Sequence, residues 1–277
     1  MCEFKLQRIG RKFILIISMQ KNITLEIVFH GGLGNQLFQL YYAICTCQEI
    51  KVSNVIINKS FLKSYSPPRD FELQGMDFKK LFGCPVSTKP SLFSRLRLPK
   101  ILRKLKGVES SIQFGRFILI DGYFQNIACY QQFDPILRQC CLVILRQGYL
   151  LEKTNMPTIK ETLHHIRLGD GAFLLDPEAE LKYLEEYIKY NNPKYIMSDK
   201  EDLVQKISAG CSTLPITIVK SNNLSAGKLL SKMGQFERVK TNGSTLALWA
   251  SILYERDFET SDHLCASFFL LFFNQKK

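Results

Sequence analysis

The sequence predicts an α/β fold, in which strands and helices alternate along the chain. Short apolar runs of strand length recur, helix-like spacings of apolar residues follow many of them, and glycines stand at several of the junctions. Such alternation is typical of parallel sheets covered by helices. A chain of 277 residues fits one large domain or two of ordinary size. We expect two α/β halves, residues 1–152 and 153–277, divided near Gly148–Pro157.

The first half is expected to begin with a buried strand and a glycine-rich turn. Leu25–Phe29 is a short apolar run, and after the turn Asn35–Glu49 places apolar residues at helical spacing. Five prolines interrupt residues 60–108, so we expect a basic, irregular insertion there. Further elements expected in this half are strands at Val55–Asn58 and Phe117–Asp121 and a helix at Ile127–Leu137.

The second half alternates more regularly. Pro177–Tyr190 has one apolar face, and its proline suits the first turn of a helix. The closing run Phe268–Phe273 fits a buried strand, an interface or an altered tail. Strands are expected at Leu163–Arg167, Lys194–Ser198, Ile216–Lys220 and Phe236–Thr241, and helices at Pro177–Tyr190, Lys200–Ile207, Leu224–Met233 and Ser244–Tyr254.

The net charge of +12 is local. Nine cations and no anion lie between Asp77 and Glu109, and residues 1–20 add four cations against Glu3. A local excess indicates an interaction surface, but no nucleic-acid motif accompanies it, so we expect no nucleic-acid partner. Ser91–Lys106 mixes basic and apolar residues, which fits peripheral contact with an anionic membrane. A solvated basic loop whose leucines pack on the first half is the alternative.

Cysteine usage and hydropathy bear on the compartment. The nine cysteines include no CxxC pair and no zinc-ligand spacing, which fits reduced, mostly buried thiols. No run approaches the ~20 apolar residues of a membrane-spanning helix. We expect a cytoplasmic protein, free or peripheral on the membrane. Four glycosylation sequons would matter only in a secretory compartment, such as the Golgi lumen of a eukaryote; they lie at Asn22, Asn58, Asn223 and Asn242.

The first candidate site is the glycine-rich turn in His30–Gln39. Gly32 and Gly34 would let a ligand approach the backbone, and free N–H groups at a helix start favour an anion or a sugar oxygen. The amides of Asn35 and Gln36 can bind sugar hydroxyls or cap the turn. No Gly-Lys-Ser/Thr follows, and the third glycine of a dinucleotide fingerprint is missing. A plain tight turn is the alternative.

Two more candidate sites lie in the second half. Arg167 ends an expected strand, where its guanidinium can hold a diphosphate through two parallel hydrogen bonds. Asp170 can anchor this arginine, cap the next turn or brace a loop, and His165 fits either the site or a hydrogen-bonded core. Ser244 and Thr245 open an expected helix, where they can cradle a phosphate or serve as an ordinary cap.

Together these segments resemble the α-1,2-fucosyltransferases, GDP-L-fucose-dependent glycosyltransferases of the family 11 type. The segment GGLGNQLFQ at residues 31–39 resembles the N-terminal signature of that family. The segment HIRLGD at residues 165–170 resembles the His-x-Arg-x-Gly-Asp motif shared by enzymes that use GDP-fucose. Weaker similar blocks occur at Gly122–Gln125, Tyr195–Asp199 and Ser244–Ser251, and all the blocks follow the family order over roughly residues 22–255.

The resemblance implies two facing Rossmann-like domains of the GT-B type. Residues 1–152 would form the acceptor side and residues 153–277 the side that holds the nucleotide-sugar donor. It also implies inverting transfer of L-fucose from GDP-β-L-fucose to a glycan hydroxyl, often O2 of a terminal galactose, in surface glycan biosynthesis. The acceptor would be a galactose-terminated glycan or a lipid-linked oligosaccharide.

The resemblance also implies roles for single residues. The expected catalytic group is Arg167 with Asp170 and His165 beside it, and the sequence identifies no catalytic base. No Asp-x-Asp occurs, so we expect a metal-independent reaction without a cofactor, in which side chains neutralise the diphosphate. The chain departs from the family at Lys200 and Leu246, among other positions, which leaves a non-catalytic glycan- or nucleotide-binding relative as the alternative. The expected donor-binding residues are Gly32, Gly34, Asn35, Gln36, Arg167, Asp199, Ser244 and Thr245.

Overall fold

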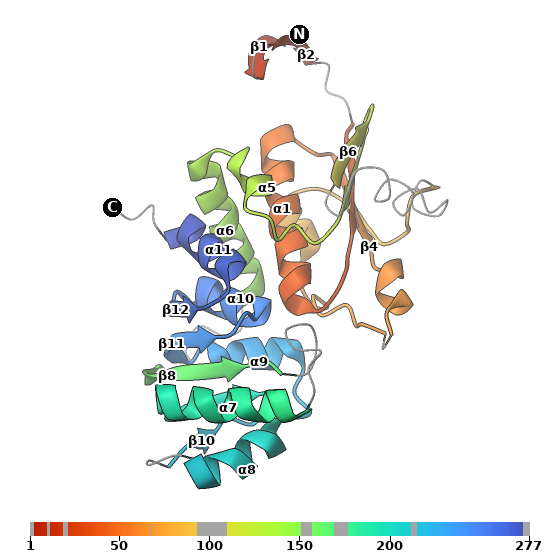
Figure 1. Cartoon of the computed structure of the whole chain (residues 1–277). Helices are drawn as coiled ribbons and strands as arrows, with labels where there is room; N and C mark the ends of the chain where they lie inside the picture. Colours follow the sequence, from red (N-terminus) through yellow and green to blue (C-terminus); the bar gives the residue numbers. More distant parts are fainter. Residues whose placement is uncertain are drawn as a thin grey trace.

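The computed structural model describes residues 3–9, 12–18, 22–66, 68–92, 110–150, 157–168, 177–211 and 215–273. Within these residues it contains two five-stranded sheets, built almost wholly from parallel strands, with helices packed against them (Figure 1). A separate antiparallel hairpin joins β1 (Glu3–Ile9) to β2 (Lys12–Ser18). The prediction of an α/β fold is confirmed.

The first sheet has the strand order β5-β4-β3-β7-β6. All neighbouring strands are parallel except β6, which forms a hairpin with β7. Alternate residues of the central strand, Leu25 and Ile27, belong to the main apolar core, whereas Glu26 is buried on the opposite face and accepts a hydrogen bond from Asn58 at 2.8 Å. The strands are β3 (Thr24–Val28), β4 (Asn54–Asn58), β5 (Val86–Ser87), β6 (Ser110–Phe114) and β7 (Phe117–Asp121).

Helix α1 (Leu33–Ile50) is buried over most of its length, because strand β3 and the helices α6 and α10 all pack against it. The expected helix at Ile127–Leu137 is instead two helices, α5 (Ala128–Gln131) and α6 (Pro135–Leu150). The carboxylate of Asp134 accepts hydrogen bonds from the N–H groups of the residues that begin α6, at 2.8 and 3.3 Å. This acidic cap, followed by proline in the first turn, starts a new helix at that point.

The insertion at residues 60–108 is only partly irregular. It contains a short 3-10 helix, η1 (Ser60–Ser64), the helix α2 (Phe78–Phe82) and the short strand β5. Asp77 caps the start of α2, and Gly83 ends it in the left-handed conformation with φ 67°. Most of the segment expected to contact a membrane, residues 93–106, lies outside the described residues.

The second sheet has the order β10-β9-β8-β11-β12, and every pair is parallel. The alternation predicted for this half is confirmed. An additional edge strand, β12, pairs with β11, and the ion pairs Arg238–Asp257 and Lys240–Glu259 also link these two strands. The strands are β8 (Ile159–Ile166), β9 (Tyr195–Ser198), β10 (Thr217–Ile218), β11 (Phe236–Thr241) and β12 (Asp257–Thr260). The helices are α7 (Pro177–Asn191), α8 (Glu201–Cys211), α9 (Ala226–Met233) and α10 (Thr245–Tyr254).

The phenylalanine-rich run near the C-terminus is helical, so the strand alternative is wrong. It forms the end of α11 (His263–Phe273), which lies beside α6 and α10 (Figure 1). The ring centroid of Phe268 is 4.7 Å from that of Phe38 in α1 and 5.3 Å from that of Tyr130 in α5. The main apolar core therefore contains side chains from both halves of the chain.

The strands of the first sheet all come before residue 152 in the sequence, and those of the second sheet all come after it. The exact domain boundary stays a prediction. A second, smaller core lies between β8, β9, α7 and α8. Seven cysteines are free thiols: Cys45, Cys47, Cys84, Cys129, Cys140, Cys141 and Cys265. No helix in the described part of the chain combines the length and the apolar content needed to cross a membrane.

Candidate functional site

Three loops converge at the carboxyl edge of the second sheet. They follow the adjacent strands β9, β8 and β11 and carry Asp199, Arg167 and Asn242. The Arg167 N–H donates to Asn242 Oδ1 at 3.0 Å, and Asn242 Nδ2 donates to the Arg167 carbonyl at 2.9 Å. The N–H of Leu168 donates to Asp199 Oδ1 at 2.8 Å. These bonds lock the three loops together around the end of β8.

The strand order shows that this edge is suited to ligand binding. The chain places β9 and β10 on one side of β8 and then crosses to place β11 on the other side. Open α/β sheets bind ligands in the crevice that such a reversal creates at the carboxyl ends of the strands. Arg167 follows β8 at this edge and is half-buried, and Asp199 follows the adjacent strand β9 and is exposed. Asp170, the other acidic residue expected here, lies outside the described residues.

His165 lies inside β8 and is buried. Desolvation by burial lowers the pKa of its imidazole to about 4, the nearby Asp199 carboxylate opposes that shift, and Arg167 adds to it. The ring is therefore neutral at neutral pH, and its Nδ1 has no hydrogen-bond partner among the described residues. A neutral, buried imidazole offers no charge to a leaving diphosphate, and the catalytic role of His165 stays a prediction.

The start of α10 combines a side-chain cap with the backbone N–H groups of a helix N-terminus. Ser244 is buried, and its hydroxyl accepts the N–H of Ala247 at 3.3 Å, so this serine serves as a helix cap. The first N–H groups of any helix lack partners within the helix and favour an anion. The half-buried Thr245 hydroxyl stands beside them, 3.5 Å from Asn35 Oδ1.

Asn35 joins the two halves of the chain at this point. Its Oδ1 accepts a hydrogen bond from Gln125 Nε2 at 2.6 Å and lies within reach of the Thr245 hydroxyl. Gly34 makes the approach possible, because a Cβ added to it would lie 2.4 Å from Thr245 Oγ1 and 2.9 Å from the N of Leu246. Nothing lies within 4 Å of a Cβ added at Gly32, so the space beside that glycine is open.

Gln36 is placed differently from expectation. It is fully buried rather than facing a cleft, and its Nε2 donates to the carbonyls of Gly31 and Asp70 at 2.9 and 2.8 Å. Its Oε1 accepts the N–H of Glu72 at 3.0 Å. These bonds fasten the insertion to the glycine-rich turn, because a helix start and a loop both carry backbone groups that need partners. A donor-binding role for Gln36 remains a prediction that these contacts do not support.

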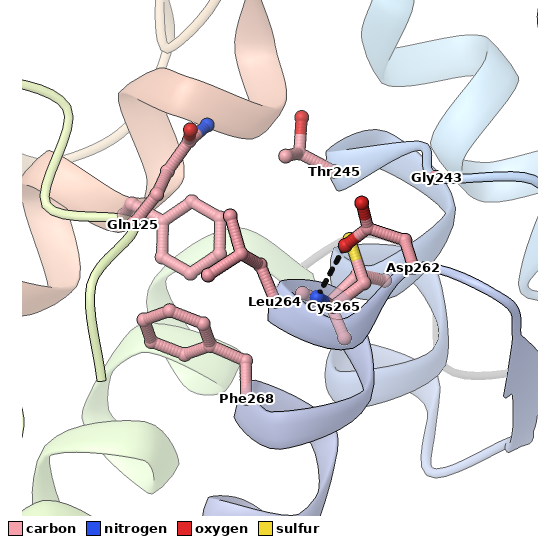
Figure 2. Close-up of a pocket in the computed structure, with 9 residues that line it drawn as sticks. Gln125, Gly243, Thr245, Asp262, Leu264, Cys265 and Phe268 are labelled. Atoms are coloured by element: carbon pink, nitrogen blue, oxygen red, sulfur yellow. Dashed lines mark hydrogen bonds between the residues drawn. The ribbon is translucent and has the colours of Figure 1, made fainter. Parts of the chain in front are cut away.

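A cavity of about 110 Å³ lies between the loop at Gln125 and the helices α10 and α11 (Figure 2). Ligand pockets usually measure some 300–1,000 Å³, so this cavity fits a small group rather than a nucleotide sugar. Asp262 lines it and accepts the N–H of Cys265 at 2.7 Å, the dashed contact in Figure 2. The lining residues are Phe38, Gln125, Gly243, Thr245, Leu248, Asp262, Leu264, Cys265 and Phe268.

Two polar residues at this site were not expected as site residues. Gln125 belongs to a block that the sequence singled out without a role, and its reach to Asn35 could not be seen along the chain. Asp262 follows the unexpected strand β12, and no sequence signal pointed to it. In the described part of the chain, no three or more histidine, cysteine, aspartate or glutamate side chains gather closely enough to hold a metal ion.

Comparison with known proteins shows a similarity in fold and none in sequence. No protein-family model matches the chain, and none of the curated proteins matches it in sequence. Among solved structures, the fucosyltransferase NodZ from Bradyrhizobium has a TM-score of 0.50 at 13% identity, over 84% of this chain and 93% of that chain. The heptosyltransferase WaaC from E. coli, with an ADP-heptose analogue, has a TM-score of 0.39 at 12% identity, over 86% and 88%.

POFUT1 in complex with GDP has a TM-score of 0.40 at 9% identity, over 87% of this chain and 99% of that chain. Identities of 9–13% are too low to carry an activity from one protein to another, and the two lower TM-scores add no argument. The chain therefore has a fold similar to that of a solved fucosyltransferase.

Proposed function

We propose that the protein is an inverting glycosyltransferase that moves L-fucose from GDP-β-L-fucose to a glycan hydroxyl. One observation carries the proposal: segments far apart in the sequence, all of them parts of the motifs that resemble the fucosyltransferases, meet at one place. Asn35 contacts both Gln125 and Thr245 there. The fold, which is similar to that of the fucosyltransferase NodZ, supports the same proposal.

In this proposal the second half holds the donor. Arg167 faces the diphosphate at the carboxyl edge of the sheet and neutralises the charge that develops as GDP leaves. The N–H groups that begin α10, with the Thr245 hydroxyl, bind the phosphate oxygens, and Asp199, which is exposed at the same edge, binds donor hydroxyls. The first half holds the acceptor, so that the two α/β halves face one another as two Rossmann-like domains of the GT-B type.

The acceptor in this proposal is O2 of a terminal galactose on a surface glycan or on a lipid-linked oligosaccharide. The basic segment at residues 91–106 would bring the enzyme to an anionic membrane on which such an acceptor is presented. Cytoplasmic location agrees with that arrangement, and location in the Golgi lumen is the alternative for a eukaryotic source. The reaction uses no metal ion and no cofactor.

A donor-hydrolysis assay and an acceptor screen test the proposal. The purified protein is expected to release GDP slowly from GDP-fucose without an acceptor, and to release it faster when a suitable galactoside is present. Other GDP-sugars and UDP-sugars serve as controls. A protein that binds GDP but never releases it from GDP-fucose would be a non-catalytic relative, and transfer from a UDP-sugar alone would rule the proposal out.

A further inference from the structure

A buried histidine–aspartate pair occupies the centre of the carboxyl edge of the first sheet. His30 comes two residues after β3, and Asp121 is the last residue of the adjacent strand β7. The chain places β4 and β5 on one side of β3 and then crosses to place β7 on the other. The pair therefore lies where the first sheet reverses its order, which is the place equivalent to that of Arg167 in the second sheet.

The geometry fixes which nitrogen of the imidazole can accept a proton. His30 Nε2 lies 2.7 Å from Asp121 Oδ1, and both side chains are almost completely buried, at 2% and 1% exposure. A carboxylate accepts hydrogen bonds, so the ring proton belongs on Nε2 and the lone pair on Nδ1. The backbone N–H of His30 donates to Gln39 Oε1 at 3.0 Å, and Gln39 also donates to the Gly122 carbonyl at 2.9 Å.

The accepting nitrogen leads towards the surface through two tyrosines. His30 Nδ1 lies 3.5 Å from the Tyr65 hydroxyl, which is 2.7 Å from the Tyr123 hydroxyl. Both tyrosines are only half-buried, whereas the imidazole is enclosed by the rings of Phe61 and Tyr123, at 5.5 and 6.0 Å between centroids. Asp121, Tyr65 and Tyr123 are thus titratable groups around the imidazole, and the tyrosines connect it to the solvent side.

The same loop brings this pair close to the donor site. Tyr123 and Gln125 lie two residues apart on the segment that follows β7, and Gln125 contacts Asn35 at the junction with α10. His30 and Asn35 lie at the two ends of the glycine-rich turn. A hydroxyl held against the tyrosine pair would therefore stand on the acceptor side of the junction at which the donor is proposed to bind.

We propose that His30 is the base that takes up the proton of the acceptor hydroxyl, with Tyr65 as the group that touches the acceptor and Asp121 as a positioning residue. This inference rests on the proposed function. The acceptor oxygen forms a bond to C1 of fucose, while the bond from C1 to the phosphate oxygen breaks and GDP keeps the electron pair. The acceptor proton passes to the Tyr65 oxygen as the Tyr65 proton passes to His30 Nδ1. The Asp121 carboxylate balances the resulting imidazolium, which returns its proton to solvent after product leaves.

Kinetics of three variants test this inference on the full chain, with GDP-fucose and an acceptor found in the screen above. His30→Gln keeps a side-chain amide that can donate to Asp121 but removes the base, and kcat is expected to fall by roughly 10²–10⁴-fold. KM for GDP-fucose and the affinity for GDP should stay near wild-type values. Tyr65→Phe removes a single half-buried hydroxyl, and Asp121→Asn removes the positioning charge, so each should also lower kcat.

A pH profile separates a proton acceptor from a merely structural histidine. Wild-type kcat should decrease as the pH is lowered and His30 becomes protonated. This decrease should be absent in His30→Gln. Tyr187→Phe is the matched control, because Tyr187 forms a comparable pair with His164 at 3.0 Å in the second half, and this variant should keep wild-type kcat.

Two results would overturn the inference. Wild-type kcat in Tyr65→Phe refutes the tyrosine step even if the buried His30 variant fails to fold. A folded His30→Gln variant with wild-type kcat and an unchanged pH profile refutes the base. Failure of the proposed function is distinguishable from both results, because in that case the wild-type protein itself transfers no fucose from GDP-fucose.

Discussion

Hydrogen bonds to the backbone of Arg167 and Leu168 hold Arg167 in place at the end of β8. The Asn242 amide bonds to both the N–H and the carbonyl of this arginine, and Leu168 is fixed in turn by Asp199. Removing the guanidinium leaves all of these bonds intact. The structure therefore separates the position of the loop from the charge that it presents to a ligand.

Arg167→Ala is accordingly expected to abolish transfer while the fold is kept. The loss of a charge-assisted, two-bond contact to a diphosphate should cost about 2–4 kcal/mol of transition-state stabilisation, or roughly 30–1000-fold in kcat/KM. Steady-state kinetics and the melting temperature measure the two effects separately. Arg238→Ala removes an exposed arginine of β11 that pairs with Asp257, and it is the matched control. A folded Arg167→Ala variant with wild-type kcat/KM would contradict the assigned role.

Two neighbouring histidines should make stability depend on pH. Burial is the main cause that lowers the pKa of His164 and of His165 to about 4 in the folded state, whereas an unfolded histidine titrates near 6.5. The unfolded chain therefore binds more protons between these values, and the free energy of unfolding falls as the pH is lowered through that window. From pH 7 to 5.5 the loss should be about 1 kcal/mol per histidine.

Urea unfolding at several pH values measures this effect. His165→Gln should remove about half of the decrease that the two histidines cause, and His263→Gln, which changes an exposed histidine, should leave the decrease unchanged. A wild-type unfolding free energy that stays constant from pH 7 to 5.5 would contradict the prediction.

Contacts between elements explain two features of the sequence, the glycine at position 34 and the aromatic run near the C-terminus. At Gly34 the helices α1 and α10 approach so closely that a side chain would not fit, so the glycine serves packing. The aromatic C-terminal residues form α11, which fills the space between α1, α5 and α10. Both features join the two halves of the molecule.

Gly34→Ala should destabilise the protein, because the new methyl group would overlap the side chain and backbone at the start of α10. Overpacking of this kind costs about 1–3 kcal/mol. Gly32→Ala is a close control on the same turn, since Gly32 has φ −81° and open space around a Cβ, and it should stay near wild-type stability. Equal unfolding free energies for the two variants in urea would show that the close approach of α1 and α10 is not tight.

Phe268→Ala tests the contribution of α11. Phe268 is 1% exposed and packs against Phe38 and Tyr130, so its truncation should cost about 3–5 kcal/mol. Leu270→Ala on the same helix removes a side chain that is 51% exposed and should change stability by less than about 0.5 kcal/mol. Denaturant unfolding compares them, and a small loss in Phe268→Ala would mean that α11 is not part of the core.

The whole molecule combines two sheets whose reversal points both carry polar pairs. In the second sheet the pair is Arg167 with Asn242, and in the first it is His30 with Asp121. The junction of Asn35 with Thr245 connects the two halves between these points. A reaction that brings a phosphorylated donor to one half and a hydroxyl acceptor to the other can use both pairs.

Removal of divalent metal ions by a chelator should not change the rate of the proposed transfer reaction. The proposed mechanism neutralises the leaving diphosphate with Arg167 and with the N–H groups of α10, so turnover should be the same with and without EDTA. GDP release in the presence of GDP-fucose and acceptor measures this. A complete loss of turnover that added Mg²⁺ or Mn²⁺ restores would show that a divalent cation takes part.

Much of the element order follows from local patterns in the sequence. The strands β7 and β11 coincide with the predicted ranges, and α1 and α10 differ from them by a residue or two. The reason is that buried positions in a helix or strand are occupied by apolar residues, whose spacing or run length can be seen in the sequence. The predictions fail where the pattern of apolar residues is weak. The run that ends α11 is apolar at successive positions and shows neither period, and β12 is a four-residue edge strand in which Phe258 is the only apolar residue.

The sequence by itself determined the α/β alternation, the glycine-rich turn and the place of Arg167 at the end of a strand. Only the tertiary structure decided that Gln36 is a buried structural amide, that Gln125 reaches Asn35 and that His30 pairs with Asp121. The physical reason is distance along the chain: Asp70 lies 34 residues from Gln36, Gln125 lies 90 residues from Asn35, and Asp121 lies 91 residues from His30. Hydrogen bonds between such residues depend on how strands are ordered in a sheet, and local periodicity carries no information about that order.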